Sequence, residues 1–198
     1  SLSSSQKSKK MNLEMHKTIA EKLFKARKHG EPIIQISSEL GLPKTEFSES
    51  DAYAIQEIQQ QMQLESGDTQ VGWKMGLTSE AKRKQMNLHS PLYGFLTQKM
   101  QIQNGSDFDI TGLIHSKIEP EVAFLIMQDL EKGCTREEVL DACGGVCAAL
   151  EILDSRYTQF KYFSLEDVIS DNSSSSHFVL GPWNKNFQNL NLKNLSMK

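Results

Sequence analysis

The spacing of apolar residues changes along the chain from a helical period to a strand-like one. From Leu13 to Lys28 apolar residues recur at roughly helical spacing, and Gly30 stands where such a helix would end. A second helix is predicted to start at Ser48, which can cap it with Asp51 three residues on, and to run to Gly67. Residues 11–67 are therefore predicted to form a small N-terminal helical region.

After residue 67 the apolar residues occur in short, partly alternating runs that are typical of strands. These runs cover residues 70–77, 94–97, 118–127, 146–154 and 177–181. Between them, residues 79–86, 135–142 and 164–169 each begin with a hydroxyl residue that can cap a short helix. The pattern predicts an α+β fold with its main domain over residues 68–198. Residues 1–10 are polar and without an apolar stretch, which suggests a disordered leader or an expression remnant.

Composition places the chain among globular proteins. Of its 198 residues 38% are hydrophobic and 24% are charged, and the formal net charge is -3. This balance gives no basic face for nucleic acid, and no apolar run is long enough to cross a bilayer. A cytoplasmic location is the default expectation. Three cysteines are too few for a disulfide framework, so we expect them to be small buried residues.

The segment "KIEPEVAF" carries two carboxylates one residue apart in an otherwise apolar run. On a strand Glu119 and Glu121 would project from one face, while Val122 and Phe124 pack on the other. Two carboxylates held close together repel unless a cation lies between them. Glu151 follows a similar apolar run, and three carboxylates without a His or Cys partner suit a hard cation such as Mg²⁺. An exposed edge strand with Glu151 on the surface explains the spacing equally well.

Five segments together resemble the hydratase/decarboxylase branch of the fumarylacetoacetate hydrolase superfamily. They occur in the family's order and read "GWKMGLTS", "SPLYGFL", "KIEPEVAF", "ALEILDSRY" and "SDNSSSSHFVLG". The resemblance covers about Glu31 to near the end of the chain. It implies a mixed β-sheet roll or barrel with short helices. It also implies Mg²⁺ or Mn²⁺ bound by Glu119, Glu121 and Glu151, and a small 2-oxo acid substrate from the meta-cleavage degradation of aromatic compounds.

Within this branch the chain resembles the decarboxylases more than the hydratases. Hydratases tend to read G-V-D-Q-P-D-F-G where this chain reads "MNLHSPLYGFLT". His89 stands where the resemblance implies Asn or Asp, which leaves the assignment of polar contacts there open. The resemblance thus implies metal-dependent decarboxylation of 2-oxo-3-hexenedioate (4-oxalocrotonate) to 2-hydroxypenta-2,4-dienoate. The second expectation is a 2-oxopent-4-enoate-type hydratase acting on 2-hydroxypenta-2,4-dienoate.

Further site residues follow from the same motifs. Lys74 is expected to be catalytic, because an unpaired ammonium between Trp73 and Met75 would be stabilised by facing carboxylates or an anionic substrate. Asp154 is expected either to orient Glu151 in catalysis or to form an ion pair with Arg156. The resemblance implies that the substrate is bound by the remaining matched polar residues, Thr78, Ser79, Asp171, Asn172 and Ser174. Thr78 and Ser79 can equally cap the following helix.

Members of this branch continue well beyond the point that matches Lys198, through strands that help to close the sheet. Either that segment is absent from this sequence or the protein is naturally shorter. In the second case an exposed sheet edge needs cover from a partner or a second copy. We expect a homo-oligomer, and association with the related hydratase is a further expectation. The shortened chain also keeps a third alternative open, a catalytically silent binding or interaction protein of the same fold.

Overall fold

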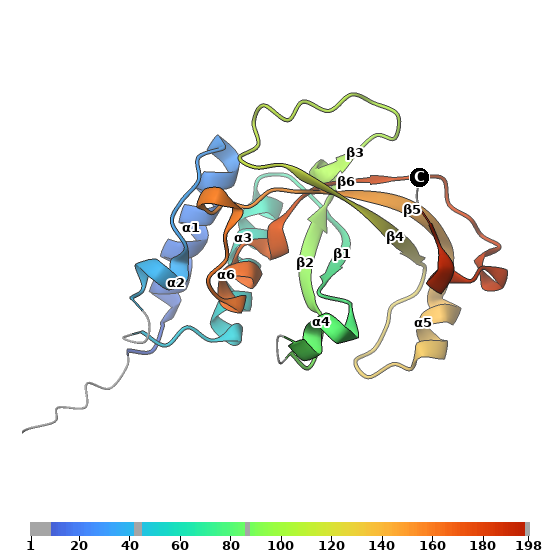
Figure 1. The fold of residues 1–198 in the computed structure, drawn as a ribbon, viewed down its shortest axis with the longest axis horizontal. Coiled ribbons are helices and arrows are strands. Elements are labelled where there is room, and N and C mark those ends of the chain that lie inside the picture. The colour runs from blue at the N-terminus through green and yellow to red at the C-terminus, as the bar shows by residue number, and fades with distance from the viewer. Residues whose placement is uncertain (1–8, 42–44, 86–87, 197–198) are drawn as a thin grey trace, which may run out of the picture.

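The computed structural model describes residues 9–41, 45–85 and 88–196 (Figure 1). Eight of the ten residues of the expected leader lie outside these ranges. The N-terminal region contains α1 (Leu13–His29), a short α2 (Ile36–Glu39) and α3 (Glu49–Glu65). Gly30 ends α1 in the left-handed conformation, with φ 66°, and Ser48 and Asp51 form the expected capping box at the start of α3.

The strands form two separate sheets. The first pairs β1 (Gln70–Gly76) with β2 (Leu92–Thr97) in an antiparallel hairpin. The second has the order β3-β6-β5-β4 and consists of β3 (Gln101–Ile102), β4 (Lys117–Ile126), β5 (Cys143–Leu153) and β6 (Ser175–Leu180). The expected mixed α+β fold is confirmed. The described strands do not close into a barrel, and β4 is an edge strand.

Short helices lie between the strands, as the hydroxyl caps predicted. They are α4 (Glu80–Gln85), α5 (Arg136–Ala142) and α6 (Leu165–Ser170). The expected helix over 79–86 includes Met86, which lies outside the described residues. Single 3₁₀ turns cover Gln98–Met100, Thr158–Phe160, Asn172–Ser174, Phe187–Asn189 and Leu192–Asn194. No helix within the described ranges is long and apolar enough to cross a membrane.

The largest core lies where α1, α3 and α6 pack together at one end of the molecule (Figure 1). Burying apolar side chains here supplies most of the stability of this region, and its fully buried members include Leu23, Ile36, Ile55, Tyr157 and Ile169. Gln59 of α3 donates a hydrogen bond of 2.7 Å to the carbonyl oxygen of Ser170. This bond fixes α3 against the C-terminal end of α6. A smaller core of Phe95, Met100 and Phe178 joins β2 to β6.

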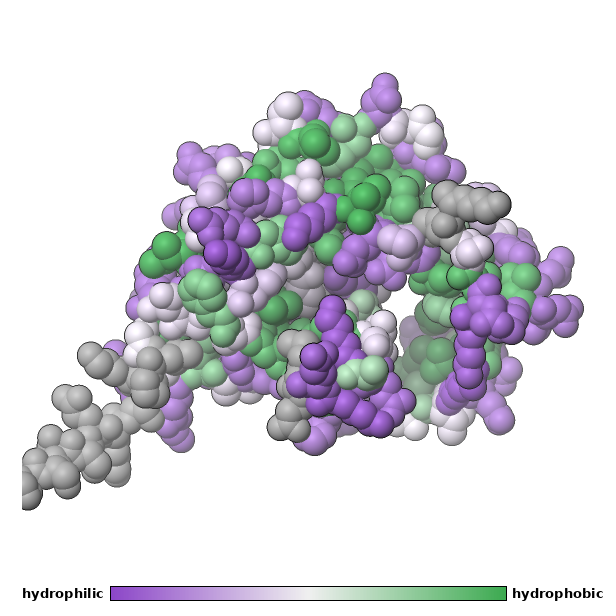
Figure 2. Space-filling model, in the orientation of Figure 1, coloured by the Kyte–Doolittle hydropathy of each residue, from purple (hydrophilic) through white to green (hydrophobic). Residues whose placement is uncertain are grey.

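One face of β4 is not covered as expected. Val122 is 38% exposed and Phe124 is 46% exposed, although both were predicted to pack. Ile118 and Ile126 on the same face are also exposed. Figure 2 shows hydrophobic residues on the surface over the four-stranded sheet. The alternation of side chains along β4 was predicted correctly, but a strand pattern does not indicate what covers each face.

Candidate metal centre

Three carboxylates meet where β4 pairs with β5. Glu119 lies directly opposite Glu151 in the antiparallel register, and Glu121 lies opposite Ala149, diagonally next to Glu151. One carboxylate oxygen from each of the three lies within 4.8 Å of the others. Glu119 is exposed, Glu121 is partly buried and Glu151 is buried. The i, i+2 spacing and the strand register therefore place all three acids on one face of the sheet.

The closeness of these acids changes their proton affinity. Burial, followed by the charges of Glu151 and Glu119, raises the pKa of Glu121. Burial also raises the pKa of Glu151, and the positive charge of Lys74 opposes that rise. Glu121 and Glu151 are thus harder to ionise here than in water, because negative charges share a partly desolvated site. A bound cation would remove this penalty.

Lys74 approaches the acids from the other sheet. It lies on β1, and its Nζ is 2.9 Å from Oε1 of Glu151 and donates a hydrogen bond of 3.0 Å to the carbonyl oxygen of Ser173. The Lys74 side chain is only 11% exposed, so this ion pair is shielded from water. These contacts place Lys74 beside Glu151 and not at an exposed position of the strand, and its catalytic function stays a prediction.

One ammonium does not balance three carboxylates. Lys74 Nζ lies 2.9 Å from Glu151 Oε1 and supplies one positive charge, whereas the cluster carries up to three negative charges. Hard divalent cations such as Mg²⁺ bind carboxylate oxygens, so the residues present fit such an ion.

A strained segment after α6 supports Lys74. Three consecutive residues have positive φ: Asn172 (49°), Ser173 (50°) and Ser174 (61°). This left-handed conformation is sterically unfavourable for residues that carry a Cβ atom. The Asn172 side chain accepts a hydrogen bond of 2.9 Å from the Phe95 N–H and donates one of 3.1 Å to the Phe95 carbonyl. These bonds hold the segment against β2 and place the Ser173 carbonyl beside Lys74.

Glycine at position 94 makes this close approach possible. A Cβ atom there would lie 2.7 Å from Oδ1 of Asn172 and 2.8 Å from the Asn172 carbonyl oxygen. Because the nearer contacts include backbone, a larger residue would push the segment away from β2. The glycine in "SPLYGFL" therefore has a steric function.

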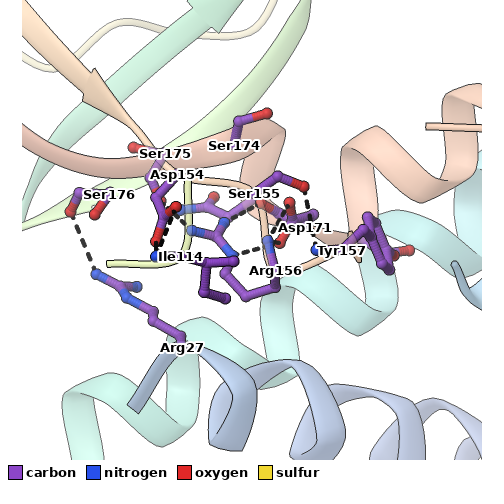
Figure 3. Close-up of polar contacts among 12 residues, drawn as sticks. Arg27, Ile114, Asp154, Ser155, Arg156, Tyr157, Asp171, Ser174, Ser175 and Ser176 are labelled. Carbon is purple, nitrogen blue, oxygen red and sulfur yellow. Dashed lines mark hydrogen bonds and ion pairs between the residues drawn. The ribbon is translucent and has the colours of Figure 1, made fainter. Parts of the chain in front are cut away.

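Buried charges fix the start of the same segment (Figure 3). Asp171 accepts a hydrogen bond from the Arg156 guanidinium, which also donates one of 2.9 Å to the Ser175 carbonyl. The Tyr162 hydroxyl donates to Asp171 at 2.7 Å. Burial raises the pKa of Asp171, and the charge of Arg156 opposes that rise. Asp171 and Asn172 are thus engaged within the protein and shape the segment around the carboxylates.

The other expected site residues make no hydrogen bond or ion pair with the three glutamates in the described part of the chain. Asp154 accepts hydrogen bonds from the backbone N–H groups of Ile114 (3.0 Å) and His115 (2.6 Å), so it holds the loop that leads into β4. Arg156 pairs with Asp171, not with Asp154. Ser79 accepts a long hydrogen bond of 3.4 Å from the Lys82 N–H, and Thr78 is exposed. The Ser174 hydroxyl contacts the Tyr162 hydroxyl.

Comparison with known proteins identifies the family. The chain is 40% identical over 167 residues to a 4-oxalocrotonate decarboxylase from a Pseudomonas species, covering 84% of this chain and 63% of that relative. It is 35% identical over 188 residues to the 4-oxalocrotonate decarboxylase of Pseudomonas putida, covering 94% of this chain and 69% of the relative. The chain belongs to the family of 4-oxalocrotonate decarboxylases and related hydratases.

Other relatives in this family include hydratases. A 2-hydroxyhexa-2,4-dienoate hydratase from Comamonas testosteroni is 35% identical over 156 residues, which are 77% of this chain and 59% of the hydratase. Among solved structures, the 4-oxalocrotonate decarboxylase of Pseudomonas putida G7 complexed with magnesium and adipate matches with a TM-score of 0.79 at 33% identity. That match covers 88% of this chain and 65% of the other. No family model matches the chain.

Two features of the site in this family member did not follow from its sequence. Tyr162 contacts both Asp171 and Ser174 across a loop, and the Ser173 carbonyl, a backbone atom, accepts from Lys74. Neither has a local pattern that marks it, since Tyr162 looks like an ordinary loop aromatic. The three consecutive positive φ angles are a property of the folded segment alone.

Proposed function

We propose that this chain catalyses the metal-dependent decarboxylation of 2-oxo-3-hexenedioate (4-oxalocrotonate) to 2-hydroxypenta-2,4-dienoate. The observation that carries the proposal is the carboxylate cluster of Glu119, Glu121 and Glu151 with Lys74 2.9 Å from Glu151. The relatives named 4-oxalocrotonate decarboxylase support it. The chain spans 63% and 69% of two of these relatives, so the activity of the whole enzyme is inferred from similarity.

The proposed cofactor is Mg²⁺ or Mn²⁺, held by Glu119, Glu121 and Glu151. The similar structure of the Pseudomonas putida G7 decarboxylase, which is complexed with magnesium and adipate, supports this choice of ion. When bound, a divalent cation supplies Lewis-acid polarisation at the C2 carbonyl of a 2-oxo acid. The glutamates would need to be ionised to hold it, and the raised pKa values of Glu121 and Glu151 mean that their ionisation requires a higher pH than that of ordinary carboxyl groups.

Lys74 is the residue that we propose to act on the substrate. In the reaction the C5–C6 bond breaks, CO₂ leaves, and the electron pair delocalises through the C3–C4 double bond onto the C2 oxygen. That oxygen must be stabilised and then protonated to give the 2-hydroxydienoate. An ammonium fixed by Glu151 and the Ser173 carbonyl is suited to hold a proton near this oxygen.

The remaining residues have supporting functions in this proposal. Asp171 and Asn172 act by shaping the segment that positions Lys74. Asp154 acts by fixing the loop before β4, so its proposed contribution to catalysis is indirect. Substrate contact by Thr78, Ser79 and Ser174 stays a prediction, as do a homo-oligomer, association with the related hydratase and a cytoplasmic location.

A hydratase is the second candidate, because hydratase relatives share the family. The same site could assist the addition of water to 2-hydroxypenta-2,4-dienoate. A catalytically silent interaction protein is the third, although the four charged residues of the site are all in place.

Product analysis separates the three candidates. Protein freed of metal with a chelator is given Mg²⁺ and either 2-oxo-3-hexenedioate or 2-hydroxypenta-2,4-dienoate, and CO₂ and hydrated product are measured. We expect CO₂ release from the first substrate that depends on Mg²⁺. Water addition to the second substrate without CO₂ release from the first identifies a hydratase. If Mg²⁺ binds and neither product forms, the enzymatic proposal is wrong.

A further inference from the structure

A cavity lies on the opposite side of the four-stranded sheet from the carboxylates. In the β5–β6 register Glu151 is opposite Phe178 and Ile152 is opposite His177. Because successive side chains alternate between the two faces of a strand, His177 projects away from the face that carries Glu151. His177 lines a cavity of about 490 Å³ between this face, the C-terminal half of α1 and the loop before β4. The cavity is therefore separate from the candidate metal centre.

Positive charge in this cavity exceeds negative charge. Its lining includes three cationic side chains, Arg27, Lys28 and Lys99, and two carboxylates, Asp109 and Asp154. Both carboxylates are already engaged, because Asp109 accepts from the Thr111 N–H and Asp154 from two N–H groups of the adjoining loop. The cations are thus left without carboxylate partners from the cavity wall.

Arg27 is the one of these three cations that is not exposed to solvent. Its guanidinium makes one long hydrogen bond of 3.5 Å, to the Ser176 carbonyl, and no ion pair to any carboxylate among the described residues. Figure 3 shows it reaching from α1 toward Ser176, away from the Arg156–Asp171 pair. A guanidinium has five N–H donors. Burial and the nearby charge of Arg156 lower the pKa of Arg27 to about 10, which still leaves it charged at neutral pH.

Part of the remaining wall of the cavity is apolar. Phe24, Phe108 and Leu113 line it, and the Phe108 ring packs against the His177 ring with a centroid distance of 4.6 Å. Burial and the charge of Arg27 lower the pKa of His177 to about 4, so that His177 is neutral at neutral pH. The cavity thus combines a cationic fork with an apolar wall.

From this geometry we propose that the cavity binds a small organic carboxylate, with its carboxyl group on Arg27 and its hydrocarbon part against Phe24, Phe108 and Leu113. A carboxylate matches the fork of a guanidinium in a bidentate manner. It would provide a direct ion-pair partner for Arg27, on which Asp171, Asp68 and Asp154 act without forming a salt bridge. The volume is within the range of small-ligand sites. This site does not depend on the proposed decarboxylation.

The test uses the metal-free full chain and benzoate as the probe. A titration followed by NMR at the imidazole of His177 should show saturable binding in the millimolar range, the affinity of one charged contact with modest apolar burial. Benzamide has nearly the same shape without the charge and should bind at least about tenfold more weakly.

Variants locate the site. Arg27→Gln should weaken benzoate binding at least about tenfold, whereas Lys25→Gln removes a charge from an exposed position of the same helix and should have no effect. Glu121→Gln should leave benzoate binding unchanged, which separates this cavity from the metal centre. If Arg27→Gln does not fold, the double variant Lys28→Gln/Lys99→Gln should still reduce affinity.

Three results would each overturn the proposal. They are no saturable shift at His177 up to tens of millimolar benzoate, equal affinity for benzamide, and unchanged affinity when the cavity cations are removed. The last result would assign Arg27 the structural role of tying α1 to β6.

Discussion

Replacing Glu121 with glutamine tests the metal centre most directly. The change keeps the size of the side chain and removes one of the three negative charges that lie within 4.8 Å of one another. Glu121 is partly buried and makes no hydrogen bond or ion pair in the described part of the chain, so no structural contact is lost with the charge. Effects on metal binding can then be separated from effects on folding.

The distance between the acids gives the size of the effect in the metal-free protein. Two unit charges 4.8 Å apart interact by about 3.5 kcal/mol at an effective dielectric constant of about 20. Solvent screening at the partly exposed Glu121 reduces this to about 1 kcal/mol. Without metal, Glu121→Gln should therefore stabilise the protein by about 1 kcal/mol, because a repulsion is removed.

This gain depends on pH with a definite sign. The pKa values of Glu121 and Glu151 are raised in the folded protein, so the folded state holds these protons more tightly than the unfolded state. The metal-free wild type accordingly loses stability as pH rises above the ordinary carboxyl pKa of 4.5. Below that value the wild type and the variant should be equally stable.

Added Mg²⁺ should reverse the order. Loss of one of three charged ligands is expected to weaken Mg²⁺ binding at least about 100-fold. At a concentration about 100 times its Kd, Mg²⁺ stabilises the wild type by about 2.7 kcal/mol, but the variant by only about 0.4 kcal/mol. For a chain of this size the wild-type gain corresponds to a Tm increase of about 5–10 °C, and the variant gain to about 1 °C.

Thermal melts over a Mg²⁺ titration, with calorimetric measurement of Kd, check both parts. Glu131→Gln is the matched control, because Glu131 is an exposed acid away from the cluster and should leave the Mg²⁺ response unchanged. A Tm increase in Glu121→Gln equal to that of the wild type would show that Glu121 is not a ligand and that the cluster is not the metal site.

Three further predictions concern other parts of the site and fold. Lys74→Ala should reduce turnover about a hundredfold or more without weakening Mg²⁺ binding, since it removes a cation beside the acids; wild-type turnover would exclude a catalytic function for Lys74. Asn172→Ala should destabilise the protein by about 3 kcal/mol in denaturant melts, because it leaves the N–H and carbonyl of Phe95 unpaired; a change below about 1 kcal/mol contradicts this. The pKa of His177 is about 4 in the folded protein and 6.5 in the unfolded chain, so the folded protein should lose stability as pH decreases from 6.5 to 4. The full loss, reached below pH 4, should be at most roughly 3 kcal/mol. In His177→Gln this loss should disappear, and an unchanged pH profile would show that His177 is not responsible.

The sequence by itself determined the local structure and the identity of the acids. Capping by Ser48 and Asp51, the stop at Gly30 and the alternation in "KIEPEVAF" depend on residues a few positions apart, and the structure contains all three. The position of Glu151 in an apolar strand also marked it as unusual. From spacing alone, however, a metal site and an exposed edge strand were equally compatible with these residues.

Tertiary structure decided which residues meet. Strand register places Glu119 opposite Glu151, and the packing of two sheets brings Lys74 to the same point. The same packing engages Asp171 with Arg156, directs Asp154 to a loop, and leaves Val122 and Phe124 exposed. None of these outcomes follows from periodicity, because a strand pattern specifies which side chains share a face but not which strand, loop or solvent that face meets. Long-range pairing is set by the free energy of the whole fold.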